Sequence, residues 1–331
     1  MTNKRSDIIL NIIKNIAFSN EIDLKSRVSK LTFKENRLAL LLDITGIPLE
    51  KAKLIQSNIE KAIFIQLPEL ETNIVLTSNS TNKPEGKPKL KLDNVKKIYL
   101  VASGKGGVGK STIATLMAYK LKKMGKKVGV LDADIYGPSI PDLFGINEKP
   151  ELDNKRMKPL NRHGIQINSI GFISAPESAV SFRGPMASKA LYQLMSLTRW
   201  DNLDCLIIDS PPGTGDIHLS LLQNYQIDEV YMVTTPQLIS KSDVQRAINL
   251  YKKFNIKIAG VIENMSYLQT TQQNHMINIF AGNAGEDIAK KFNIPLMAKV
   301  PVIPELSAQC DKGLGLEKFT YLIDSIFLEK L

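Results

Sequence analysis

The stretch GKGGVGKS, residues 104–111, decides the fold of this chain. It matches the pattern G-x-x-x-x-G-K-[ST], follows the apolar run KIYLVAS and opens the amphipathic run STIATLMAYKLKKMG. Glycines in such a loop let backbone N–H groups wrap phosphates, and the N-terminus of the following helix adds its positive end. The strand, loop and helix together predict a phosphate-binding loop (P-loop).

The loop residues have separate expected roles. Lys110 is expected to reach the outer phosphates of ATP, and the Ser111 hydroxyl is expected to ligate Mg²⁺. A P-loop needs one lysine, and this one has a second, Lys105. Judged from the loop alone, the Lys105 side chain would simply point into solvent. The predicted nucleotide contacts are Gly104, Lys105, Gly106, Gly107, Val108, Gly109, Lys110, Ser111 and Thr112.

Three aspartates that follow apolar runs are the candidate acids. Asp209 ends LDCLIID, as a Walker B acid does, and is expected to hold the magnesium shell through water. Asp132 and Asp134 end KVGVLDAD, and their spacing places both on one face of an extended segment. We expect Asp134 to position the attacking water or accept its proton, and Asp132 to support the metal shell indirectly. The alternative is that this pair caps the turn YGPSIPDLFG.

Short apolar runs rich in β-branched residues alternate with amphipathic segments after residue 97. They are KIYLVAS, KVGVLDAD, LDCLIIDS, EVYMVTT and KIAGVIENM. Such alternation is typical of a parallel sheet covered by helices on both faces. The sequence therefore predicts an α/β P-loop NTPase fold, with ligands at the carboxyl ends of the strands.

The first 80 residues predict a separate small α+β domain. Isoleucines at positions 9, 12, 13 and 16 follow helical spacing, and the later segments read as a hairpin, a helix and a strand: SKLTFKENRLALLLDI, PLEKAKLIQSNIEKAIF and ETNIVLTS. Residues 81–97 are basic and carry prolines and a glycine, which is typical of a solvated linker. The predicted organisation is a small domain at 1–80, this linker, and the ATPase domain at 98–331.

Composition excludes several classes of partner. The net charge is +10, but the lysines are spread along the chain without an interleaved aromatic run, so no nucleic-acid partner is expected. The apolar run LALLLDI is far shorter than the ~20 residues of a membrane-spanning helix. Asp7 interrupts the apolar part of the N-terminus, which argues against a cleavable signal. Two cysteines make no disulfide framework. We expect a cytoplasmic protein.

Several motifs together resemble a known family. The early lysine of the P-loop, LDADIYGPSIPDLFG, FRGPM, LIIDSPPGTGD and ENMSY look like the deviant Walker A ATPases, specifically the Mrp/ApbC-type iron-sulfur cluster carriers. The likeness covers about residues 97–331. The N-terminal region is similar in length and layout to the small domain that often precedes this ATPase, although the usual DPE-like opening and cysteine are absent.

The resemblance implies the cofactors, the oligomeric state and the partners of this chain. Its cofactors are ATP and Mg²⁺, its form is a homodimer with nucleotide between the subunits, and its partners are iron-sulfur apoproteins or assembly proteins. Lys105 would then reach into the partner's site and neutralise phosphate charge, as an arginine finger does. Asn264, after the run VIE, would contact the adenine edge. The implied catalytic residues are Lys105, Lys110 and Asp134.

The sequence departs from the family where a cluster would bind. In the cluster carriers, C-P-x-C follows ENMSY after two residues, and its thiolates from two subunits hold one bridging cluster. Ungapped alignment puts Thr270 and Gln273 at the two cysteine positions, and neither is a soft ligand. Cys205 is expected to be a small buried hydrophobe within a strand, and Cys310 an ordinary residue of a helix.

No iron-sulfur ligand is identified elsewhere. The histidines lack partners at ligand spacing: they are His163, His218 and His275. A cluster is implied by the family, but its cysteine ligands are absent.

Three hypotheses follow. The first is an ATPase acting in iron-sulfur protein assembly, and the second is a nucleotide-gated scaffold without cluster chemistry. The third is a MinD/ParA-like positioning ATPase, which requires a surface for membrane or DNA. The apolar stripe of the tail GLEKFTYLIDSIFLEKL could face lipid, but its polar face mixes acids with lysines, so packing onto the body is expected.

Overall fold

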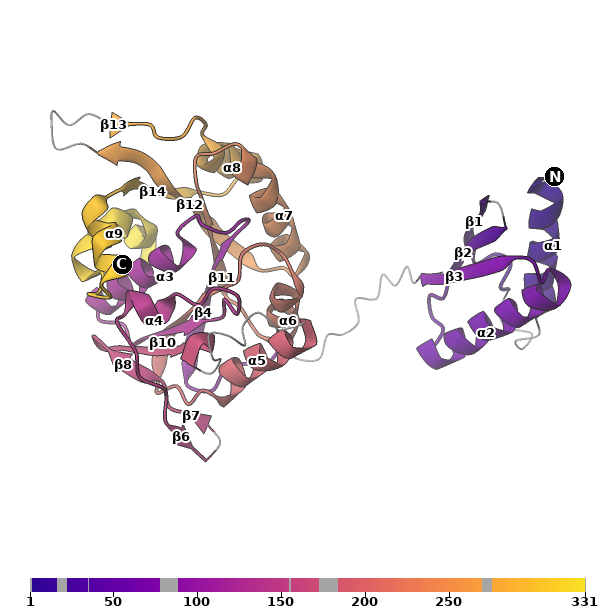
Figure 1. Cartoon of the computed structure of the whole chain (residues 1–331), viewed down its shortest axis with the longest axis horizontal. Helices are drawn as coiled ribbons and strands as arrows, with labels where there is room; N and C mark the ends of the chain where they lie inside the picture. Colours follow the sequence, from indigo (N-terminus) through magenta and orange to yellow (C-terminus); the bar gives the residue numbers. More distant parts are fainter. Residues whose placement is uncertain are drawn as a thin grey trace. The chain divides into compact units, whose positions relative to one another are not determined.

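The computed structural model describes residues 2–16, 23–34, 36–77, 89–154, 156–172, 184–269 and 276–330. Contacts within the chain divide it into two units, Met1–Gly86 and Lys87–Leu331. Each has its own apolar core, so each is described by itself (Figure 1).

The N-terminal unit is a three-stranded sheet with two helices. Its elements are α1 (Thr2–Asn15), β1 (Val28–Lys34), β2 (Arg37–Asp43), α2 (Leu49–Gln66) and β3 (Glu71–Thr77). Strands β1 and β2 form the predicted antiparallel hairpin, and α2 connects β2 to the parallel strand β3. Alternation along β2 buries Leu38, Leu40 and Leu42 against isoleucines of both helices. The predicted small α+β fold is confirmed.

The second unit is built on a mostly parallel sheet. Its order is β13-β12-β11-β4-β10-β5-β9-β8, and β14 also pairs with β12. Antiparallel pairing occurs between β8 and β9 and between β12 and β13. The strands are β4 (Val95–Ser103), β5 (Val128–Asp132), β8 (Leu160–Arg162), β9 (Ile165–Ser169), β10 (Leu203–Asp209), β11 (Glu229–Thr234), β12 (Lys257–Gln269), β13 (Met276–Ile277) and β14 (Leu296–Val302).

Helices cover both faces of this sheet, as predicted (Figure 1). One face packs against α5 (Gly184–Leu197), α6 (Asp216–Asn224), α7 (Ile239–Lys253) and α8 (Ala284–Phe292). The other packs against α3 (Lys110–Lys123), α4 (Ile140–Leu143), α9 (Pro304–Asp311) and the 3₁₀ segment η3 (Glu317–Lys330). The turn η1 (Ile170–Phe172) follows β9, and β6 (Leu152–Asp153) pairs with β7 (Arg156–Met157). Central strand β4 is buried on both faces, which explains its continuous apolar run.

The predicted linker is shorter in the structure than residues 81–97. Residues 81–88 lie outside the described residues, whereas Leu90 forms a parallel bridge with Tyr225 and β4 already begins at Val95. Leu90 N–H donates to the carbonyl of Asn224, and Gln226 N–H donates to that of Leu90. The C-terminal part of the basic run therefore belongs to the ATPase unit, because its backbone is paired there.

The C-terminal tail packs onto the body, as predicted. Its apolar stripe is buried against the α3 face of the sheet, with Phe319, Ile323, Ile326 and Phe327 at 3% exposure or less. Two ion pairs, Lys120–Asp324 and Lys122–Glu317, join η3 to α3. The stripe is thus already occupied by protein and is not presented to lipid.

Phe327→Ala should lower the free energy of unfolding by about 3–5 kcal/mol, because it leaves a cavity beside Tyr231. Urea unfolding followed by circular dichroism measures this. The matched control is Tyr321→Ala in the same segment, whose side chain is exposed, and we expect a change within about 0.5 kcal/mol. Equal stability of the two variants would contradict the packing described here.

Candidate functional site

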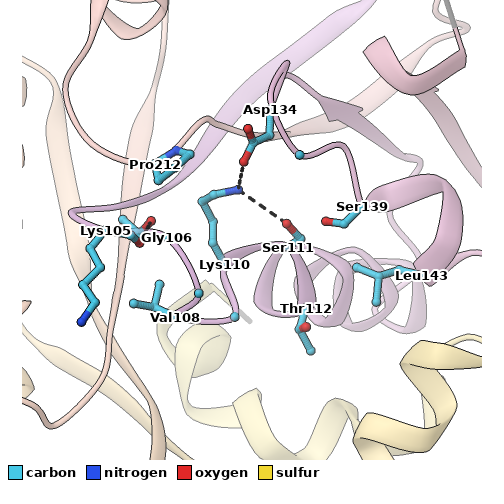
Figure 2. A pocket seen from close by; sticks show the side chains of 14 residues that line it. Lys105, Gly106, Val108, Lys110, Ser111, Thr112, Asp134, Ser139, Leu143 and Pro212 are labelled. Carbon is cyan, nitrogen blue, oxygen red and sulfur yellow. Dashed lines mark hydrogen bonds and ion pairs between the residues drawn. The ribbon is translucent and has the colours of Figure 1, made fainter. Parts of the chain in front are cut away.

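The P-loop bends around a cavity at the carboxyl end of β4. This strand ends at Ser103 and α3 begins at Lys110, so the loop between them presents backbone N–H groups and a helix N-terminus to the same space (Figure 2). The cavity measures about 290 Å³. It is lined by Ser103, Lys105, Gly106, Gly107, Val108, Gly109, Lys110, Ser111, Thr112, Asp134, Gly137, Ser139, Leu143 and Pro212.

Lys110 lies between two carboxylates. Its Nζ is 2.6 Å from Asp209 Oδ1 and 3.6 Å from Asp134 Oδ2, and it is 3.5 Å from Ser111 Oγ. All three charged groups are buried. Burial of charge is costly unless it is paired, so the two acids hold the lysine at the base of the cavity and the lysine holds them.

The second oxygens of both carboxylates have no hydrogen-bond partner. Asp209 Oδ2 and Asp134 Oδ1 are buried and unpaired; Asp134 lines the cavity together with Ser111, whereas Asp209 is fully buried beneath it and contacts Lys110. Burial raises the pKa of Asp134, and Lys110 opposes that rise. Oxygen acceptors of this kind suit Mg²⁺, which keeps several waters and needs few protein ligands. The residues present therefore fit a magnesium ion.

Asp132 is held differently from Asp134. Strand β5 ends at Asp132, whose carboxylate accepts the backbone N–H of Asp134 and of Ile140 and the hydroxyl of Ser169, at 3.0 to 3.1 Å. Burial and the neighbouring Asp209 raise the pKa of Asp132 to about 8. Asp132 does not line the cavity; it fixes the turn that carries Asp134 into it, as in the capping alternative.

Close contacts to neighbouring elements shape the loop. At Gly104 a Cβ would lie 2.4 Å from the backbone nitrogen of Val244, so α7 approaches too closely for any side chain. Gly109 has φ +80°, and a Cβ there would meet the amide of Asn264 at 2.2 Å. That amide donates to the carbonyl of Val108 at 2.9 Å. Asn264, predicted to reach the adenine edge, thus contacts the P-loop backbone itself.

Lys105 points away from the cavity that its own loop forms (Figure 2). Its Nζ donates to Gln237 Oε1 at 3.3 Å, in the turn before α7. The two P-loop lysines therefore have opposite placements: Lys110 faces inward and Lys105 outward.

Five lining residues were not among the predicted site residues: Ser103, Gly137, Ser139, Leu143 and Pro212. Gly137, Ser139 and Leu143 belong to YGPSIPDLFG, which was quoted only for the capping alternative and the family likeness. Pro212 belongs to SPPGTGD, which is tied to the P-loop because Gly213 N–H donates to the carbonyl of Ser103 at 3.0 Å. The sequence did carry a signal for these positions, because turn-forming residues follow both Asp134 and Asp209.

The positions aligned with the missing cysteines, Thr270 and Gln273, lie outside the described residues, as does His275. Cys205 is buried in β10, as predicted. Cys310 is partly buried on α9, and burial raises the pKa of its thiol, with a hydrogen bond from Thr112 opposing this. Within the described ranges, no group of three or more His, Cys, Asp or Glu side chains is placed to hold a metal ion.

His218 is buried behind the site, on α6, and neither ring nitrogen has a hydrogen-bond partner. Burial, assisted by Lys110, lowers the pKa of His218 to about 4. The unfolded chain protonates its imidazole near pH 6.5, so stability is lost as the pH falls from there toward 4.

We expect the free energy of unfolding of the wild type to fall by about 2–3 kcal/mol more than that of His218→Phe between about pH 7 and pH 4.5. Urea titrations at both pH values measure it. Parallel losses in the two proteins would show that His218 does not titrate as described.

Comparison with known proteins adds the family. Residues 94–321 match the family described as NUBPL iron-transfer P-loop NTPase. A protein of Rickettsia bellii named iron-sulfur cluster carrier protein is 48% identical over 322 residues, 96% of each chain. The chain belongs to the iron-sulfur cluster carrier family of P-loop NTPases. The carrier of Escherichia coli is 41% identical over 247 residues, which are 74% of this chain and 65% of that protein.

Two solved structures share the fold. A nucleotide-binding protein from Archaeoglobus fulgidus, in complex with ADP, has a TM-score of 0.61 and 32% identity over 69% of this chain and 90% of its own. The cell division ATPase MinD of Pyrococcus furiosus, at 21% identity, 71% of this chain, 99% of its own and a TM-score of 0.51, shares the fold. Among the described helices of this family member, none is both long and apolar enough to cross a membrane.

Proposed function

We propose that this chain binds and hydrolyses Mg·ATP in the P-loop cavity and uses the cycle, as a homodimer, in the assembly of iron-sulfur proteins. The observation that carries this proposal is the buried ion pair of Lys110 with Asp209 beneath a cavity at a helix N-terminus. The named function of the relatives supports the process, and the ADP of the archaeal structure supports the ligand.

Phosphates would replace the carboxylates as partners of Lys110. The loop N–H groups and the N-terminus of α3 attract the same anions, and Thr112 lines the cavity beside them. Moving Lys110 from Asp209 to a phosphate would leave the Asp209 carboxylate without its cation. That carboxylate is then available to the metal shell.

The residues proposed to hold Mg²⁺ are Ser111 directly and Asp209 through water. Asp132 supports this site indirectly, by accepting the backbone N–H of Asp134. When bound, Mg²⁺ supplies positive charge to the phosphate oxygens. Asp132 contributes by fixing the backbone N–H of Asp134, so it is a positioning residue.

Asp134 is the proposed base. Its Oδ1 is buried without a partner at the cavity, where it can orient a water and accept its proton. A carboxylate whose pKa is raised by burial holds that proton better than an exposed one. Lys110, 3.6 Å from Oδ2 before phosphates bind, opposes that rise in pKa.

The missing thiol pair favours a second candidate, a nucleotide-gated scaffold that serves assembly without carrying a cluster through C-P-x-C. Iron and sulfide content after anaerobic expression, measured alongside a Cys205→Ser/Cys310→Ser variant, separates the two. Stoichiometric iron and sulfide in the wild type would support direct carriage by other ligands, and none would support the scaffold. The tail stripe is buried, so it gives the positioning ATPase no lipid-facing surface.

The test of the site itself is a titration of the purified chain with Mg·ATP, followed by phosphate release. We expect saturable binding and slow turnover; absence of saturable binding would refute the proposed function. We propose the cytoplasm as the compartment, because both cysteines are free in the structure and free thiols are typical of a reducing compartment.

A further inference from the structure

A second cavity lies at the opposite edge of the sheet from the P-loop. Its volume is about 570 Å³, against about 290 Å³ for the cavity that the P-loop forms. The parallel strands β4, β10, β11 and β12 line it with residues near their amino ends, whereas the P-loop follows the carboxyl end of β4. We call it the amino-edge cavity. Its volume falls in the range of about 300–1,000 Å³ that is typical of small-molecule sites.

The pairing of these strands brings the lining side chains together on one face of the sheet. Lys97 of β4 is in register with Cys205 of β10, and Tyr99 of β4 is in register with Glu229 of β11. Glu229 is in turn in register with Lys257 of β12. Since alternate residues of a strand share a face, Lys97 and Tyr99 lie on the same side of the sheet. This is the side that α3 covers.

Apolar side chains form the floor of the amino-edge cavity. Tyr99 and Cys205 are 5% and 3% exposed, so they belong to the core and contribute only part of their surface to the cavity. Leu121 and Met124 line it from the C-terminal end of α3. Such a floor suits the apolar or aromatic body of a ligand.

Both carboxylates that line the cavity are paired with lysines that line it as well. Asp204 Oδ1 is 2.7 Å from Lys96 Nζ, and Glu229 Oε1 is 2.9 Å from Lys257 Nζ. The other oxygen of Glu229 accepts the Tyr231 hydroxyl at 2.9 Å. The negative charge at the cavity is therefore already balanced by two of its lysines.

Two further lysines, Lys97 and Lys126, line the cavity and leave an excess of positive charge. Both are exposed, and neither forms a salt bridge with any residue in the part of the chain that the structure describes. Their charges repel one another across the cavity, and an anion bound there would relieve that repulsion. An apolar floor with two unpaired cations beside it fits an anion that carries an apolar body.

We propose that the amino-edge cavity binds an organic phosphate, a small molecule with a phosphate monoester head and an apolar or aromatic body. Such a head carries about −1.5 to −2 charges at pH 7, which matches Lys97 and Lys126. A single carboxylate would neutralise only one of these two lysines. The body would lie against Leu121 and Met124. This site is separate from the nucleotide cavity, so the inference does not depend on ATP hydrolysis at the P-loop.

The test is a fluorescence titration of the full chain with naphthyl phosphate, in Mg²⁺ and a non-hydrolysable ATP analogue that occupies the P-loop. We expect saturable binding that is about 30-fold weaker in Lys97→Ala/Lys126→Ala, because two charge-assisted contacts are lost. Naphthol lacks the charge and inorganic phosphate lacks the body, so both should bind much more weakly than naphthyl phosphate.

Two further variants keep the test specific. Lys149→Ala/Lys189→Ala removes the same number of charges from exposed positions outside the cavity and should bind like the wild type. Lys97→Arg/Lys126→Arg keeps the charges and should keep most of the affinity.

No saturable binding by the wild type would overturn the proposal. Equal affinity in Lys97→Ala/Lys126→Ala, or an equal loss in Lys149→Ala/Lys189→Ala, would do the same, because the cavity lysines would then not be the ligands. Inorganic phosphate that binds as tightly as naphthyl phosphate would overturn the assignment of an organic body.

Discussion

Lys110→Ala should abolish ATP turnover, with a loss of about 10³-fold or more. Lys110 is the cation at the base of the cavity, and the phosphates of ATP have no other buried cation there among the lining residues that the structure describes. Phosphate release under saturating Mg·ATP measures the loss, and fluorescence titration with a labelled nucleotide measures the accompanying loss of affinity. Unchanged hydrolysis would contradict the assignment of the site.

Folding has to be separated from chemistry in this variant. Removing Lys110 leaves Asp209 and Asp134 buried without their cation, which is expected to cost about 3–5 kcal/mol of stability. The double variant Lys110→Ala/Asp209→Asn removes one of those charges, so it should regain much of the stability without regaining turnover. Lys122→Ala, at the far end of α3 and paired only at the surface with Glu317, is the control and should keep turnover.

The parts of this fold that the sequence predicted are those fixed by local pattern. Strands β4, β5, β10 and β11 are continuous apolar runs because both faces of the sheet are covered, and such runs are recognisable without knowledge of their neighbours. The P-loop is equally local, since its glycines, lysine and serine act within eight residues. Pattern also indicated which face of the tail would be buried, because Phe319, Ile323 and Phe327 follow one stripe.

Tertiary contacts decided what local pattern could not predict. The two-residue spacing of Asp132 and Asp134 predicted that both lie on one face of an extended segment, but β5 ends at Asp132, and Ser169 of the neighbouring strand donates a hydrogen bond to Asp132. Asn264 lies 156 residues from Val108, and no local signal pairs them. The same holds for Leu143 and Pro212, which reach the cavity from separate turns. The C-terminal boundary of the linker was misplaced because Leu90 pairs with a residue far along the chain.

Lys105→Ala should keep much of the affinity for ATP but lose about 10³-fold in turnover. Lys110 and the loop N–H groups remain in the cavity, whereas the outward lysine contributes only when a partner brings phosphates to it. Titration and phosphate release on the same preparation separate the two effects. Because Lys105 makes one long hydrogen bond, 3.3 Å to Gln237, within the described residues, the substitution should leave stability nearly unchanged. Turnover equal to the wild type would remove the role in the partner's site.

Mixing two inactive variants tests whether Lys105 acts across the pair. Asp134→Asn keeps Lys105 and is expected to bind ATP without turning it over, whereas Lys105→Ala keeps Asp134. In an equal mixture about half of the pairs are mixed, and each holds one site with Asp134 and a Lys105 from the partner, so about a quarter of wild-type turnover should return. A lysine that acts within its own subunit would leave the mixture as inactive as either variant.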